Sequence, residues 1–103
     1  MAELGAKQGV CSTGNSLDCE PKDDEILKSN DASCKDMEAA AIAWSAGLCG
    51  VPVIGLKVIT DIVDNERPAH EEFMENLGTA AKSLQAAMPK CIEFVVGKCV
   101  GEL

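Results

Sequence analysis

The sequence lacks the features of several large function classes. It has no stretch rich in lysine or arginine, and its formal net charge is −8 over 103 residues. So acidic a chain has no basic surface for a nucleic-acid backbone or an anionic membrane. No apolar run approaches the roughly 20 residues that a membrane span needs, and residues 1–15 contain no apolar core of a signal peptide. We therefore expect no nucleic-acid or membrane partner, and a cytoplasmic location.

Metal-binding and disulfide motifs are also absent. The chain has six cysteines and one histidine. No cysteine pair forms C-x-x-C, and His70 has no cysteine near it in the sequence. This spacing argues against zinc, and a disulfide framework needs a secreted context for which the sequence gives no sign. We expect reduced, mostly buried thiols, with no metal and no cofactor.

The length and the apolar content indicate one small domain. The chain has 103 residues, of which 47% are hydrophobic, so a core can form and global disorder is not expected. We find no internal repeat and no low-complexity tract. The whole chain, residues 1–103, is therefore treated as a single domain.

The first third of the chain predicts a strand followed by a helix. Residues 7–13 read as a short strand that runs into a turn at 14–15. Pro21 and the acidic residues after it are typical of a helix N-terminus, where carboxylates favour the positive end of the helix dipole. This helix should reach about Ser29 and end at 30–31.

The middle of the chain predicts an extended piece, a helix and a strand. Residues 32–37 read as extended, and a helix rich in small residues follows from Glu38 to Gly50. Residues 51–59 are apolar throughout except for Lys57, which is typical of a strand buried on both faces of a parallel sheet.

The last third predicts a solvated loop and a long helix. Residues 60–67 are polar, and Asp64, Asn65 and Glu66 belong to this loop on the simplest interpretation. Pro68 opens a helix whose apolar face carries Phe73, Leu77, Ala81, Leu84 and Met88. Pro89 should kink or break this helix.

The order of these elements predicts an α/β fold with a mainly parallel sheet covered by helices. Three strands make a thin sheet whose edges something else should cover. The chain therefore reads as part of a larger unit.

Two carboxylates stand where a ligand would bind. In open α/β sheets, ligands bind at the carboxyl ends of the strands. Asp61 follows the strand at 51–59, Glu38 follows the extended piece at 32–37, and the loop at 14–18 follows the first strand. If the strands are parallel neighbours, Asp61 and Glu38 converge on one crevice with that loop as a wall.

Such a pair of acids suits two tasks. One carboxylate accepts hydrogen bonds from vicinal sugar hydroxyls, and the other, if burial raises its pKa, donates a proton to a leaving group. Each acid also has a structural interpretation: Asp61 could cap the loop after its strand, and Glu38 could be the first-turn acid of its helix. We interpret His70 as exposed and Trp44 as a core residue.

Three motifs suggest a family. "STGNSLD", "KDMEAAAIA" and "TDIVDNERPAHEEFMENL", with the spacing between them, resemble the plant-type 5′-methylthioadenosine nucleosidases of the nucleoside phosphorylase superfamily. The resemblance runs from about Gly9 almost to Leu103. It implies part of a three-layer fold, with a mainly parallel or mixed sheet flanked by helices, and a single domain that corresponds to the C-terminal portion of a nucleosidase.

The resemblance also implies an activity and a set of site residues. The family hydrolyses the N-glycosidic bond of 5′-methylthioadenosine to adenine and 5-methylthioribose, and some members accept S-adenosylhomocysteine. Asp61 resembles the general acid that protonates adenine N7, supported by Thr60. Glu38 resembles the residue that holds the ribose hydroxyls, and Met37 the residue packed against the sugar. The other expected substrate-binding residues are Leu17 and Asp18 of the adenine-binding loop, and Lys35 and Asp36 of the second motif.

Family members are longer than this chain, and their water-activating glutamate lies in an N-terminal part that no residue here matches. Three functions follow as alternatives. The chain could be a nucleosidase that, in isolation, has little or no turnover. It could be a non-catalytic fragment that binds a nucleoside or a partner, or a relative of the phosphorylases. The family is dimeric, so a homodimer is expected if the complete domain is present.

Overall fold

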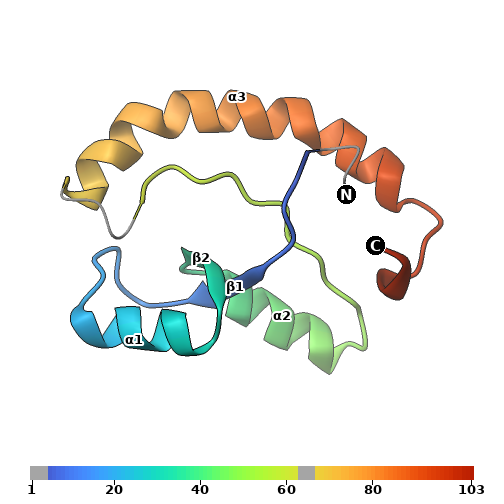
Figure 1. The fold of residues 1–103 in the computed structure, drawn as a ribbon. Coiled ribbons are helices and arrows are strands. Elements are labelled where there is room, and N and C mark those ends of the chain that lie inside the picture. Colours follow the sequence, from blue (N-terminus) through green and yellow to red (C-terminus); the bar gives the residue numbers. More distant parts are fainter. Residues whose placement is uncertain (1–4, 63–66) are drawn as a thin grey trace.

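The computed structural model describes residues 5–62 and 67–103 (Figure 1). The elements in chain order are β1 (Val10–Thr13), α1 (Pro21–Ser29), β2 (Ala32–Asp36), α2 (Ala39–Leu48), α3 (Ala69–Val95) and the short 3-10 helix η2 (Val100–Glu102). Figure 1 shows α1 and α2 on one side of the two strands, with residues 51–62 and then α3 on the other. The predicted alternation of strands and helices is confirmed from β1 to α2.

The strands β1 and β2 form a two-stranded parallel sheet, with α1 as the crossover between them. Thr13 pairs with Asp36, so both strands end at the same edge of the sheet. Gly9 makes the close approach possible before β1 begins. A Cβ atom at Gly9 would lie 2.4 Å from Cβ of Ser33, which no real side chain could tolerate.

The ends of the first two helices follow local sequence signals. Helix α1 begins at Pro21, as predicted, and the Glu20 amide donates to the Asp23 carboxylate at 3.0 Å. Helix α2 ends in a Schellman motif, with Gly50 at φ +66°. In this motif the Val51 amide donates to the Ala46 carbonyl at 2.9 Å, and the Gly50 amide donates to the Gly47 carbonyl at 3.1 Å.

The predicted strand at residues 51–59 does not form. The segment is extended and runs between the sheet and α3 (Figure 1), but it pairs with no strand among the described residues. It is also not buried on both faces, since Val51 is 55% exposed and Ile59 is 58% exposed. A strand exists through the hydrogen bonds of its neighbours, and the described part of the chain offers none to residues 52–59.

Helix α3 begins after Pro68, as predicted. Of the two effects expected of Pro89, a kink or a break, the break does not occur. Proline removes one intrahelical hydrogen bond, the one that would reach the Gln85 carbonyl. Pro89 is exposed, so water can satisfy that carbonyl and the helix continues to Val95.

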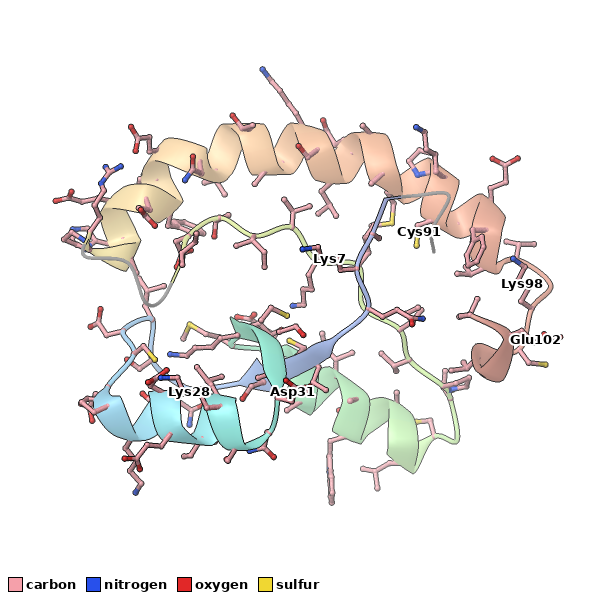
Figure 2. All side chains as sticks on the ribbon, in the orientation of Figure 1. Lys7, Lys28, Asp31, Cys91, Lys98 and Glu102 are labelled. Carbon is pink, nitrogen blue, oxygen red and sulfur yellow. The ribbon has the colours of Figure 1, made fainter. Side chains whose placement is uncertain are left out.

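The buried face of α3 also differs from the predicted apolar stripe. Its buried residues are Glu72, Ala80 and Cys91. Figure 2 shows Cys91 on the side of α3 that faces the start of the described chain.

The described residues bury very little. Only Ala80, Cys91 and Glu72 fall below a tenth exposed. The expectation of mostly buried cysteines is therefore wrong, because Cys91 alone is buried among six free thiols. The expected core position of Trp44 is wrong as well, since this side chain is 73% exposed. His70 is exposed, as expected. No helix in residues 5–62 or 67–103 is long and apolar enough to cross a membrane.

Candidate functional site

The carboxyl ends of β1 and β2 meet at a group of residues that we name the Asp36 junction: Thr13, Asp36, Ala39, Ala40 and Lys57. The Asp36 carboxylate accepts a hydrogen bond from Thr13 Oγ1 at 2.7 Å and another from the Ala39 amide at 2.9 Å. It also forms an ion pair with Lys57. In turn, Thr13 Oγ1 accepts from the Ala40 amide at 2.9 Å. The junction thus binds β1, β2, the start of α2 and the extended segment to one carboxylate.

The electrostatics of the junction follow from these contacts. The Asp36 side chain is 10% exposed, and burial by itself raises the pKa of this carboxyl. The hydrogen bonds from Lys57, Thr13 and Ala39 outweigh burial and lower the pKa of Asp36 from 3.8 to about 2. The hydrogen bond to Asp36 raises the pKa of Lys57. Both groups are therefore charged at neutral pH.

Glu38 follows the Asp36 junction, and its side chain does not stabilise the start of α2. Glu38 occupies the N-cap position of α2, but its side chain makes no capping hydrogen bond. The first two amides of the helix are instead satisfied by Asp36 and Thr13. Glu38 is exposed, and no described residue donates to its carboxylate. The Glu38 side chain therefore does not cap the helix, and the carboxylate is available to a ligand.

The end of the extended segment is held against α3. Thr60 Oγ1 donates to Asp61 Oδ1 at 2.6 Å, which fixes the orientation of that carboxylate. The Thr60 carbonyl accepts from Asn76 Nδ2 at 2.8 Å, and the Ile62 amide donates to Glu72 Oε2 at 3.2 Å. Two side chains of α3 therefore place Asp61 at the carboxyl end of the segment.

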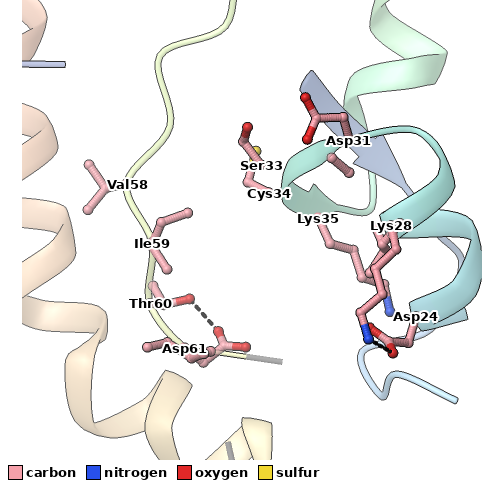
Figure 3. Close-up of a pocket in the computed structure, with 13 residues that line it drawn as sticks. Asp24, Lys28, Asp31, Ser33, Cys34, Lys35, Val58, Ile59, Thr60 and Asp61 are labelled. Carbon is pink, nitrogen blue, oxygen red and sulfur yellow. Dashed lines mark hydrogen bonds and ion pairs between the residues drawn. The ribbon is translucent and has the colours of Figure 1, made fainter. Parts of the chain in front are cut away.

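Asp61 lines a hollow of about 520 Å³ between the extended segment and the sheet (Figure 3). One wall is formed by Val58 to Ile62, and the opposite wall by residues of β2 and α1, among them Lys35 and Cys34. Figure 3 shows Thr60 and Asp61 on one side of the hollow and Lys35 on the other. The hollow is large enough for a nucleoside-sized ligand.

Of the other predicted site residues, Thr60 and Lys35 line this hollow and the rest do not. Lys35 Nζ donates to the Asp18 carbonyl at 2.8 Å, so it links the loop after β1 to the hollow. Leu17 and Met37 are 45% and 44% exposed. Among the predicted residues, the structure places Asp61, Thr60 and Lys35 around one hollow. Leu17, Asp18, Asp36, Met37 and Glu38 are not in its wall. The expected crevice, shared by Asp61, Glu38 and the loop at 14–18, does not appear as one cavity.

The Cys11 thiol of the sheet is a poor nucleophile at neutral pH. Cys11 and Cys34 are partners across the two strands. Burial, followed by the contact with Cys34, raises the pKa of Cys11 to about 11, which keeps it protonated at neutral pH. Among the described residues, no group of three or more histidine, cysteine and acidic side chains could hold a metal ion.

Two residues of the junction were missed from the sequence. Lys57 is the single charge in the apolar run at 51–59, and a lone lysine there needs an acidic partner. That signal could have led to Asp36. Thr13 carries no comparable signal, because its role depends on the register that brings it opposite Asp36.

The sequence and the structure were compared with known proteins. The model of the Phosphorylase superfamily matches residues 4–93. This chain belongs to that superfamily. It is 48% identical over 103 residues to the 5′-methylthioadenosine/S-adenosylhomocysteine nucleosidase of Arabidopsis thaliana, covering 100% of this chain and 41% of the relative. It is 42% identical to the 5′-methylthioadenosine nucleosidase of the same plant, with 100% and 39% covered.

A solved structure of an MTA/SAH nucleosidase superposes with a TM-score of 0.87 at 47% identity, over 99% of this chain and 42% of that protein. The superfamily member described here therefore spans about two fifths of the length of the relatives it matches. The resemblance to the nucleosidases and the predicted fold class are confirmed. The described elements form part of a nucleoside-phosphorylase-like fold.

Proposed function

We propose that this chain supplies the purine-protonating and ribose-binding groups of a 5′-methylthioadenosine nucleosidase. The observation that carries the proposal is the contrast between two neighbouring acids. The Asp36 carboxylate is saturated by protein donors, whereas the Glu38 carboxylate, two residues later, is exposed and receives none from any described residue. Because Asp36 and Thr13 satisfy the first amides of α2, the Glu38 carboxylate is available to accept hydrogen bonds from sugar hydroxyls.

The roles follow from the chemistry of N-glycosidic cleavage. The bond between C1′ and the purine nitrogen breaks through an oxocarbenium-like state, so positive charge grows on the ribose. Glu38 binds the ribose hydroxyls and stabilises that charge. Asp61, oriented by Thr60, gives its proton to adenine N7, so that the base leaves as a neutral molecule. Water then adds to C1′ and loses a proton to the water-activating glutamate of the family, which no residue of this chain matches.

The remaining predicted residues position the substrate. Leu17 and the backbone at Asp18 bind the adenine ring, and Lys35 holds that loop through the Asp18 carbonyl. Met37 packs against the sugar. Asp36 acts indirectly, since its bonds to Ala39 and Lys57 fix the turn that presents Glu38.

The water-activating glutamate of the family has no match in this chain. We therefore propose that the isolated chain binds a nucleoside weakly and turns over little or none of it. Calorimetry with adenine and with a non-hydrolysable 5′-methylthioadenosine analogue tests this. We expect heat of binding at millimolar ligand, and a loss of at least tenfold in affinity for the analogue in Glu38→Gln. The affinity for adenine should be unchanged in that variant. An absence of heat with either ligand would refute the proposal.

The cellular setting is part of the proposal. We propose that the chain acts in methionine salvage in the cytoplasm, and that the complete domain is a homodimer. A fluorescent fusion that collects in an organelle, or a complete assembly that sediments as a monomer, would contradict these two statements.

A further inference from the structure

Residues 52–59 form an apolar extended segment without backbone partners. Its sequence is that of a buried strand, and within the described residues none of its amides or carbonyls makes a hydrogen bond. The segment is held only by contacts at its sides and ends. These are the Schellman closure at Val51, the Lys57–Asp36 ion pair, and the bonds of Thr60 and Ile62 to α3. A segment with apolar side chains and unpaired backbone N–H and C=O groups is stable when neighbouring strands form hydrogen bonds along both of its edges.

Helix α2, which precedes this segment, is also apolar and unburied. Helix α2 has the sequence AAAIAWSAGL, which is apolar all around, and none of its residues is buried. Trp44 is 73% exposed and Leu48 is 75% exposed, and these residues, four apart, lie on one face of α2. A helix that is apolar on every side belongs in the interior of a larger protein.

The chain exposes more surface than a compact monomer of its mass. The chain exposes 7894 Å², whereas a compact monomer of its mass exposes about 5,500 Å². Its radius of gyration is 14.9 Å, against about 13 Å for a compact domain of its length. The excess area, roughly 2,400 Å² on this chain alone, is of the size that permanent interfaces bury.

The comparisons indicate what fills these faces. With a TM-score of 0.87 over 99% of its residues, the chain has the conformation of the corresponding 42% of a longer nucleosidase. The unpaired edge at residues 52–59 and the exposed face of α2 therefore have the shape of surfaces that the rest of that fold would cover.

We propose that the edge formed by residues 52–59, together with the exposed face of α2, binds a polypeptide that carries the unmatched part of the fold, whether it is separate from this chain or continuous with it. Backbone pairing along residues 52–59 anchors this polypeptide, and Trp44 and Leu48 dock against it. This inference rests on the proposed function for the identity of the partner, but its test reads association and needs no catalysis.

The test co-expresses the full chain with the part of the Arabidopsis thaliana 5′-methylthioadenosine/S-adenosylhomocysteine nucleosidase that the chain does not match. We expect a stable one-to-one complex by size exclusion with light scattering. Amide exchange at residues 52–59 should slow at least a hundredfold on complex formation. Emission from Trp44, the single tryptophan of the chain, should shift to the blue. Separate elution of the two chains, or self-association of this chain through the same face, would overturn the proposal.

A matched pair of variants isolates the backbone pairing. Ile54→Pro removes one amide donor that has no partner in the described chain, so the free variant should keep its far-ultraviolet circular dichroism. Its affinity for the partner should fall at least tenfold. Ile54→Val keeps the amide and should bind as the parent does. Equal affinity of the proline variant would contradict strand pairing. A complex that forms but releases no adenine would refute the proposed function and leave this inference standing.

Discussion

The Asp36 junction and residues 52–59 lie next to each other, linked through Lys57, and they contrast in how their polar groups are satisfied. At the junction, one carboxylate receives donors from Thr13, Ala39 and Lys57. In residues 52–59, no backbone group finds a partner within the described chain. The chain thus completes the turn that presents Glu38, but leaves incomplete the strand that leads to Asp61. The two halves of the proposed site therefore differ in how far they depend on a partner.

The largest expected effect comes from breaking the junction. Asp36→Ala leaves Lys57, Thr13 and the Ala39 amide without their acceptor, and we expect the free energy of unfolding to fall by about 3 kcal/mol. Urea denaturation measures this. Asp24→Ala is the matched control, because the Asp24–Lys28 pair is an exposed pair within one helix, worth less than about 0.5 kcal/mol. Equal losses in the two variants would show that the junction does not hold the fold.

A smaller loss is expected at Gly9. Gly9→Ala places a Cβ atom against Ser33 and should push β1 away from β2, at a cost of about 2 kcal/mol. Ser33→Gly in the same chain should restore most of this loss. Gly47→Ala is the control in open space inside α2 and should stabilise the chain slightly. A neutral Gly9→Ala would mean that the strands are less closely packed than the structure shows.

The junction also predicts a pH dependence. Because the pKa of Asp36 falls from 3.8 to about 2 on folding, the unfolded state binds more protons between these values. The stabilisation is complete above about pH 4 and is lost as the pH falls through 2, up to about 2 kcal/mol. Thermal denaturation between pH 5 and pH 2 should show this loss. The loss should be absent from Asp36→Asn, and its persistence there would assign it to another group.

The smallest effect tests the other region. Pro89→Ala restores one hydrogen bond in the exposed part of α3 and should stabilise the chain by about 1 kcal/mol, part of the gain being offset by greater freedom in the unfolded chain. Amide exchange at residues 52–59 should not change, since the helix does not supply their missing partners. Slower exchange there would show that α3 covers the segment more fully than we describe.

The sequence predicted best the features whose causes are local. The proline at the start of α1 and the glycine after α2 act within one turn of chain, and both helices begin and end near the predicted residues. The strand at 51–59 failed because its pattern reports burial by neighbours that the described chain does not contain. The Asp36–Lys57 pair was missed because its partners come from distant positions.

The candidate site divides in the same way. The order of the strands predicted that Asp61 and Glu38 share one crevice, but Glu38 does not line the hollow that Asp61 lines. Lys35, which was expected only from the family resemblance, does line it. The availability of Glu38 could not be read from its position. It depends on Asp36 and Thr13 satisfying the helix amides instead, which only the register of β1 and β2 brings about.

The most direct test of the account measures adenine release from 5′-methylthioadenosine by the co-expressed complex. We predict that the complex hydrolyses the substrate, and that the chain alone does not. Asp61→Asn in this chain should lower kcat at least a hundredfold while the complex still assembles. Hydrolysis by the Asp61→Asn complex at the parent rate would contradict the account, because the proton would then come from elsewhere.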